Sequence, residues 1–127
     1  AHVSVDDTGS LRVEGLWCAI DCGLYVNPSI VERQMQSAMV CGLTAVLTGK
    51  IDFKDGAVVQ SNFHDYPALG MTQTPPMHVH IVQSDNDPGG YGEPGLPPLA
   101  PAVTNAIFAA TGKRIRRLPL SDQDLRV

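Results

Sequence analysis

Glu93 is the one carboxylate in a stretch, residues 88–98, that holds four of the 12 glycines and four of the ten prolines. Glycine lets a backbone approach a ligand closely, while proline fixes φ and removes an N–H donor, so this composition predicts a tightly shaped loop. A carboxylate in such a loop, among apolar neighbours and ahead of a helix, is suited to act as a general base. The alternative is a rigid surface turn whose glutamate is only solvated.

Gln34 is a second polar side chain that could contact a ligand. It falls early on a predicted helix over residues 28–48, within reach of anything bound at the N-terminal end of that helix. An ordinary exposed glutamine is the alternative interpretation.

The histidines and cysteines do not form a recognisable metal motif. His78 and His80 lie on one face of a predicted strand, and no third ligand stands nearby in the sequence, so we interpret them as solvent-facing and predict no metal site. Cys18, Cys22 and Cys41 have no C-x-x-C spacing and are odd in number, which argues against both a zinc site and a disulfide framework. We expect all three to be small buried hydrophobic residues.

Bulk properties narrow the classes of partner. The formal net charge of −4 and the pI near 5.4 argue against nucleic acid or an anionic membrane as the main partner, and no apolar run is long enough for membrane insertion. A length of 127 residues with 43% apolar composition predicts one domain, 1–127. The chain starts at Ala1 without an initiator methionine, from which we expect a processed or excised piece.

Local signals predict an α+β fold. Asn27-Pro28 begins the helix over 28–48, and Gly112 ends a second helix over 101–111. Gly42 inside the first helix predicts close packing against another element. Alternating patterns and turn residues predict strands at 2–6, 11–20, 50–54, 57–62 and 77–82. We expect a mixed sheet made of two hairpins and an extra strand, covered on one face by both helices, with the tail after Leu118 extended.

Five motifs in order give the chain a family resemblance. They are Asp21-Cys22-Gly23 with Asn27-Pro28, Gln34, Gly56 with Asn62 and Tyr66-Pro67, Gly90-Tyr91-Gly92-Glu93-Pro94, and the ending from Gly92 to Pro119. Together they resemble the C-terminal part of the molybdenum-binding large subunit of the xanthine dehydrogenase/aldehyde oxidase family. Within it, the isoquinoline 1-oxidoreductase β-subunit branch is the most similar.

The resemblance implies a function and a set of site residues. In this family a molybdopterin-type molybdenum cofactor supports hydroxylation of an N-heteroaromatic ring or an aldehyde, with water as the source of oxygen. Glu93 matches the general base and Gln34 a glutamine that binds the pterin. Only these two residues are carried over from the family, and we expect Gly90 and Gly92 to be supports that let the loop pass close to the metal. The implied partners are the remainder of the large subunit, a small iron–sulfur subunit and a small heterocycle or aldehyde, in either the cytoplasm or the periplasm.

The chain also departs from that family, whose full subunit is several times longer. We therefore expect no cofactor on this chain alone and little or no hydroxylase activity from it. Two other classes stay open. One is a non-catalytic interaction module, recognisable by an exposed apolar surface and by self-association or a co-purifying partner. The other is a standalone binding domain that uses the loop 88–98 for a different ligand.

Overall fold

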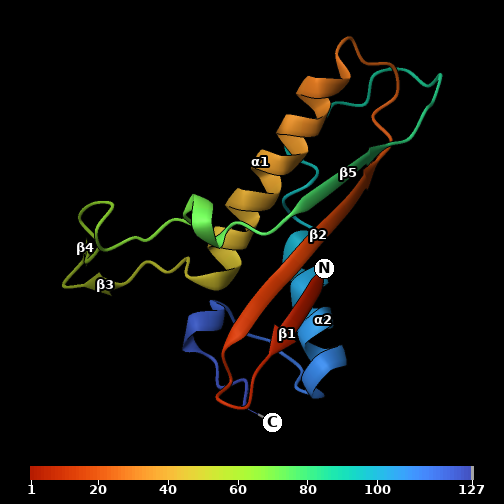
Figure 1. Cartoon of the computed structure of the whole chain (residues 1–127). Helices are drawn as coiled ribbons and strands as arrows, with labels where there is room; N and C mark the ends of the chain where they lie inside the picture. Colours follow the sequence, from red (N-terminus) through yellow and green to blue (C-terminus); the bar gives the residue numbers. More distant parts are fainter. Residues whose placement is uncertain (127) are drawn as a thin grey trace.

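A computed structural model describes residues 1–126 of the chain (Figure 1). The elements follow in the order β1 (His2–Val5), β2 (Leu11–Ile20), α1 (Pro28–Leu47), β3 (Phe53–Lys54), β4 (Ala57–Val58), the 3-10 helix η1 (Met71–Gln73), β5 (Met77–Ile81), α2 (Leu99–Thr111) and the 3-10 helix η2 (Leu120–Asp122). No helix among the described residues is long and apolar enough to cross a membrane.

The main sheet has three strands in the order β1-β2-β5. The β1–β2 pair is antiparallel and the β2–β5 pair is parallel, so the sheet is mixed as predicted. Asp6 nucleates the β1–β2 turn, because its Oδ1 accepts hydrogen bonds from the N–H groups of Thr8 and Ser10, both at 2.9 Å. The α+β class is confirmed.

A bulge in β2 changes which of its residues reach the core. His2 pairs with Gly15, but the next residue, Val3, pairs with Val13, which leaves one extra residue on β2. Val13 and Leu16 would face opposite sides of a regular strand. Because of the bulge, both pack into the same core.

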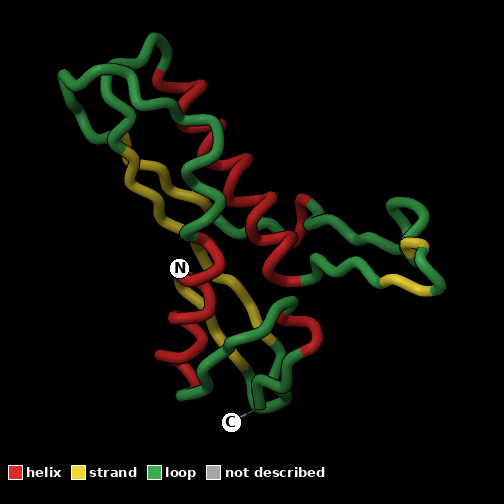
Figure 2. The backbone as a smooth tube through the Cα atoms, turned by 180° about the vertical axis from the view of Figure 1, so that it is seen from behind, coloured by secondary structure: helices red, strands yellow, loops and turns green. Residues whose placement is uncertain are grey.

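Both helices cover one face of this sheet, as expected (Figure 2). The core between the layers is centred on four buried side chains. Leu16 is 2% exposed, and Leu43, Val103 and Ile107 are fully buried. On the opposite face Trp17 is 58% exposed and stacks on His78 with ring centroids 5.3 Å apart. His80 is exposed as well, so the solvent-facing interpretation of both histidines is confirmed.

Local capping explains why α1 begins at Pro28. The Asn27 Oδ1 accepts a hydrogen bond from the Ser29 N–H at 2.9 Å, and Pro28 occupies the first helical position. The predicted close approach at Gly42 is also confirmed, since a Cβ there would lie 2.8 Å from Leu99 Cδ2. The helix α2 begins at Leu99, two residues before the predicted start.

The second predicted hairpin does not join the main sheet, contrary to expectation. β3 and β4 have two residues each and form a separate two-stranded sheet. Residues 49–67, which we call the arm, project away from the main body (Figures 1 and 2). All four residues of the two strands are exposed. Such short strands present no buried face that could join a core.

Two smaller expectations also need correction. Cys22 is buried and Cys18 is half-buried, but Cys41 is exposed on α1 and not a core residue. The tail is not simply extended, because it contains η2, and Leu120 and Leu125 are buried in the main core. Apolar side chains that follow a proline-containing segment can return to the core without forming a strand.

Candidate functional site

Two loops that are about 60 positions apart in sequence meet beside the N-terminal end of α1, at the top of Figure 1. They are residues 21–27, after β2, and residues 82–98, after β5. The Gly89 N–H donates to the Cys22 carbonyl at 2.9 Å, and the Leu24 N–H donates to the Asn86 carbonyl at 3.0 Å. The parallel pairing of β2 with β5 brings both loops to the same end of the sheet.

Gly23 makes this meeting possible. Its φ is +67°, a conformation that residues with a Cβ rarely adopt. A Cβ at this position would lie 2.2 Å from the Asp87 carbonyl oxygen and 2.7 Å from that of Asn86. The two loops can therefore approach this closely only because residue 23 has no side chain.

The second half of the longer loop is packed along α1. Tyr91 contacts a buried cluster that includes Val31 and Met35 of the helix. A Cβ at Gly95 would lie 3.2 Å from the Ala38 Cβ and 3.3 Å from the Met35 Sδ, so the backbone touches the helix there. The loop 88–98 is held in place by these contacts, as its composition predicts.

Glu93 lies at the first position of the turn formed by residues 93–96. Its carbonyl accepts a hydrogen bond from the Leu96 N–H at 3.0 Å, while its side chain is exposed. The carboxylate is thus carried on a fixed backbone and points out of this chain's own core. It is available to a group that the chain itself does not contain.

The two predicted glycine supports differ from Gly23. Gly90 has a φ of +82°, but a Cβ added at Gly90 or Gly92 would meet no atom of the chain within 4 Å. Packing within this chain therefore does not require a glycine at residue 92. The space beside both residues is open.

Gln34 lies on the part of α1 that carries the Glu93 turn. Its side chain is exposed, and it precedes by one helical turn Ala38, against which Gly95 packs. The structure thus brings Gln34 and Glu93 to the same region, which sequence spacing alone did not do.

Protein ligands for a metal do not converge at this site. Within residues 1–126 no group of three or more His, Cys, Asp or Glu side chains has a geometry suited to hold a metal ion. Burial raises the pKa of the Cys18 thiol, which keeps it protonated and makes it a poor nucleophile. Where the Glu93 turn packs on α1, Glu93 supplies an exposed carboxylate and Gln34 an exposed amide.

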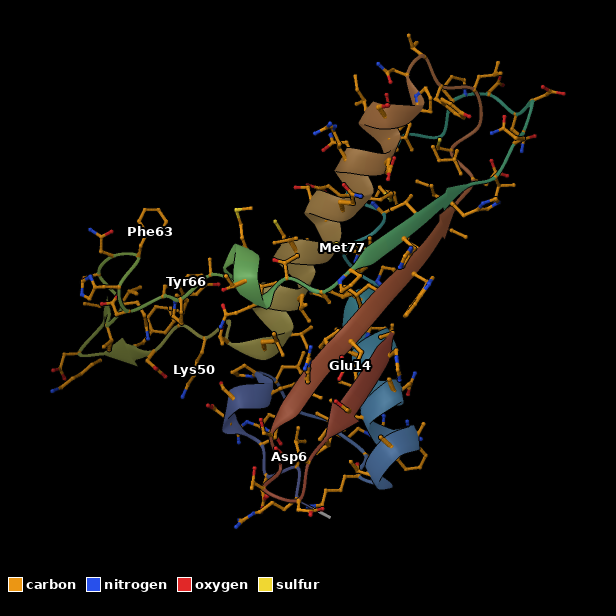
Figure 3. All side chains as sticks on the ribbon, in the orientation of Figure 1. Asp6, Glu14, Lys50, Phe63, Tyr66 and Met77 are labelled. Atoms are coloured by element: carbon orange, nitrogen blue, oxygen red, sulfur yellow. The ribbon has the colours of Figure 1, made fainter. Side chains whose placement is uncertain are left out.

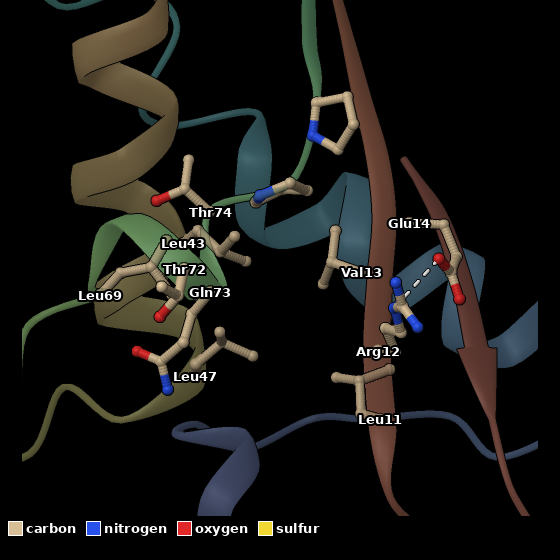
Figure 4. A pocket seen from close by; sticks show the side chains of 12 residues that line it. Leu11, Arg12, Val13, Glu14, Leu43, Leu47, Leu69, Thr72, Gln73 and Thr74 are labelled. Atoms are coloured by element: carbon tan, nitrogen blue, oxygen red, sulfur yellow. Dashed lines mark ion pairs between the residues drawn. The ribbon is translucent and has the colours of Figure 1, made fainter.

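The cavities among residues 1–126 include two of more than 400 Å³. One, of about 420 Å³, lies between the two loops and is lined by Gly23, Leu24, Tyr25, Gln83, Ser84 and Asp85. Its wall includes a hydrogen bond of 2.9 Å from Gln83 Nε2 to the Tyr25 hydroxyl, a pair that sequence analysis missed because 58 residues separate the two. The other, of about 410 Å³, lies between β2 and η1 (Figure 4).

Known proteins share both sequence and fold with this chain. The isoquinoline 1-oxidoreductase subunit beta of Brevundimonas diminuta is 40% identical over 111 residues, which cover 87% of this chain and 14% of the relative. A membrane-bound aldehyde dehydrogenase (pyrroloquinoline-quinone) of Gluconacetobacter polyoxogenes is 35% identical over 126 residues, which cover 98% of this chain and 16% of the relative. A solved Cu,Mo-CO dehydrogenase has the same fold, with a TM-score of 0.80 at 22% identity over 92% of this chain and 16% of that one.

The aligned part of the chain thus spans 14% to 16% of the length of these relatives. The family described as the molybdopterin cofactor-binding domain matches residues 1–75, which include α1 with Gln34 and the loop of Gly23. This chain belongs to the molybdopterin cofactor-binding domain family.

Proposed function

We propose that this chain is the C-terminal part of a molybdenum hydroxylase large subunit and that Glu93 is its general base. The observation that carries the proposal is the Glu93 turn. It is packed on α1 through Gly95, yet it presents an exposed carboxylate beside open space at Gly90 and Gly92.

The residues present fit a molybdopterin cofactor that other segments hold. A carboxylate, an amide and two glycines without Cβ neighbours supply a proton acceptor, a hydrogen-bonding group and room for close approach. The described residues offer no three-ligand metal set, which agrees with a metal bound through its pterin. When bound, the cofactor supplies the redox chemistry, while the protein supplies position and proton transfer.

Each of these side chains then has a defined task. The Glu93 carboxylate accepts a proton as the substrate carbon is hydroxylated, and the turn fixed on α1 keeps its oxygens in one place. The Gln34 amide donates to and accepts from the pterin ring system. Gly90 and Gly92 keep the backbone free of side chains where the cofactor passes.

The substrate class follows from the relatives' names. Isoquinoline appears in one and an aldehyde in another, so the proposal covers an N-heteroaromatic or an aldehyde. The remaining chain of the large subunit is the main partner, and a small iron–sulfur subunit receives the electrons.

The test is Glu93→Gln in the complete oxidoreductase that contains this chain. Loss of a general base lowers kcat by about 10²- to 10⁴-fold, while the molybdenum content stays unchanged. The matched control is Glu32→Gln, which changes an exposed carboxylate of α1 that accepts a hydrogen bond from Gln36 at 3.3 Å. A Glu93→Gln enzyme with a normal kcat would contradict the proposal.

A second candidate, a non-catalytic interaction module, is favoured by the arm. Phe53 is 73% exposed and Phe63 is 87% exposed, and Figure 3 shows Phe63 projecting from the upper loop of the arm. Exposed aromatic side chains of this kind mark contact surfaces. Full activity with Glu93→Gln, combined with loss of subunit assembly when Phe63 is replaced by serine, would favour this candidate.

A further inference from the structure

Strand β2 has an open edge along its first half. On one side β1 pairs with Leu11–Gly15, but on the other side β5 pairs only with Leu16–Ile20. The Leu16 N–H donates to the Pro76 carbonyl at 3.0 Å, where that second pairing begins. Within residues 1–126, no strand lies against the outer edge of Leu11–Gly15.

The backbone groups on this edge have a definite direction. The Asp6 N–H donates to the Ser10 carbonyl at 3.1 Å, which makes this pair a hydrogen-bonded one. Pairs alternate along an antiparallel ladder, so Arg12 bonds β1 while Leu11 and Val13 direct their N–H and C=O groups away from it. Two donors and two acceptors therefore face the open edge.

A long groove follows the edge. The 410 Å³ cavity of Figure 4 shares Leu11 and Leu47 with a further cavity of about 260 Å³ that continues past Gly9 toward η2. In Figure 4, Leu11 and Val13 stand on one side of the space, with Leu69 and Leu47 opposite. Four residues of β2, numbers 11–14, border the groove, which corresponds to a length of roughly 13 Å in an extended chain.

The chain's own sequence explains why the groove is not filled by β5. The groove lies in line with β5 on the same side of β2, where a longer β5 would continue. Pro75 and Pro76 have no N–H to donate to a ladder, and the chain before them turns off into η1. A strand position next to β2 is thereby left vacant.

We propose that an extended segment of the longer subunit, from outside these 127 residues, fills this groove as an added strand beside Leu11 and Val13. This proposal rests on the proposed function, which makes the chain one part of a larger subunit. The aligned relatives are about six times as long as this chain, because 111 aligned residues are 14% of one and 126 are 16% of the other, so ample chain exists to supply the strand.

The chemistry of the groove matches an extended chain. The outward N–H and C=O groups of Leu11 and Val13 repeat at the two-residue spacing of a strand, which an added strand satisfies group by group. Leu43 and Leu47 line the groove from α1 and offer an apolar surface to alternate side chains of that strand. A compact ligand would reach only some of these N–H and C=O groups.

Hydrogen exchange in the complete large subunit tests the proposal without any variant. The amides of Leu11 and Val13 should exchange at least about 100-fold more slowly than the amide of Asp7 in the neighbouring turn. They should exchange about as slowly as the amides of residues 16, 18 and 20, which face β5. Exchange of both amides at the rate of Asp7 would overturn it.

Photo-cross-linking then identifies the occupant. A benzophenone amino acid at Thr72, which is exposed and lines the groove, should capture a peptide of the same subunit from outside this chain. The control position is Asp7, which lies outside the groove and should not capture that peptide. Capture of a second copy, capture of a different subunit, or no captured peptide each overturns the proposal.

The hydrogen-exchange result and the activity of the Glu93→Gln enzyme test the two proposals independently. An unprotected edge together with an inactive Glu93→Gln enzyme refutes only the added strand. A protected edge together with a fully active Glu93→Gln enzyme refutes only the general base.

Discussion

The arm and the loop that carries Glu93 both depend on glycine turns, but they are held in different ways. The arm is closed by contacts between near neighbours in sequence, such as the bond of 2.8 Å from the Val59 N–H to the Asp52 carbonyl. The loop is held by residues far away in sequence, including Cys22 through Gly89 and Ala38 through Gly95.

This difference shows what positions a functional side chain. Asp55-Gly56 forms its predicted turn, yet the arm packs little against the body and its strands stay exposed. The loop 88–98 contains no regular strand or helix before Leu99, but its backbone touches both α1 and the loop after β2. Tertiary contact, more than regular secondary structure, fixes the place of Glu93.

The largest expected effect in this comparison comes from Gly23→Ala. The new Cβ would lie only 2.2 Å from the Asp87 carbonyl oxygen, and residue 23 would have to keep a φ of +67°. Left-handed backbone costs about 1–2 kcal/mol for a residue with a Cβ, and forced repacking adds about 1–3 kcal/mol. We expect the free energy of unfolding, measured by urea denaturation, to fall by about 3 kcal/mol or more.

Gly56→Ala is the matched control in the arm. Its φ is +80°, similar to that of Gly23, but a Cβ there would meet no atom within 4 Å. The loss should be about 1 kcal/mol, from backbone strain alone. Equal losses for the two variants would contradict the view that the loops at the Glu93 end are held by tertiary contact.

An intermediate effect is expected from Gly95→Ala. Its Cβ would press on Ala38 at 3.2 Å and on Met35 at 3.3 Å, so the free energy of unfolding, measured by urea denaturation, should fall by about 1 kcal/mol as the turn moves off α1.

Gly92→Ala should leave the thermal midpoint of unfolding unchanged, because the space beside residue 92 is open in this chain. In the complete enzyme Gly92→Ala should instead lower cofactor content or kcat. A Gly92→Ala enzyme with normal cofactor content and normal kcat would contradict a close cofactor at this residue.

The smallest effect concerns a carboxylate of the arm. Hydrogen bonds from the backbone N–H groups of Asn62 and Ser61 hold the pKa of Asp65 below its usual value. A folded pKa that is depressed gives stabilisation present above the unfolded pKa of about 3.9 and lost as pH falls through the folded value. NMR spectra should show the Ser61 and Asn62 amides unchanged near neutral pH and shifting only below about pH 3.9. A transition at or above the unperturbed value would refute this.

Much of the fold could be predicted because its signals are local. The Asn27 cap, the Gly112 stop and the Asp55-Gly56 turn each act within a few residues, and each lies where it was expected. The bulge in β2 and the separation of the arm could not be predicted. Both depend on which distant backbone a strand pairs with, and backbone hydrogen bonds are the same for every residue type except proline.

The sequence by itself determined the two helices, the first hairpin and the motifs of the molybdopterin cofactor-binding family. It also singled out Glu93 and Gln34, whose roles stay predictions. Only the tertiary structure decided that the turn of Glu93 lies on the helix of Gln34, and that the β2 edge next to Leu11 stays open. The physical reason is that residue types encode turns and periodic faces over short distances, whereas the meeting of two loops depends on how the whole chain packs.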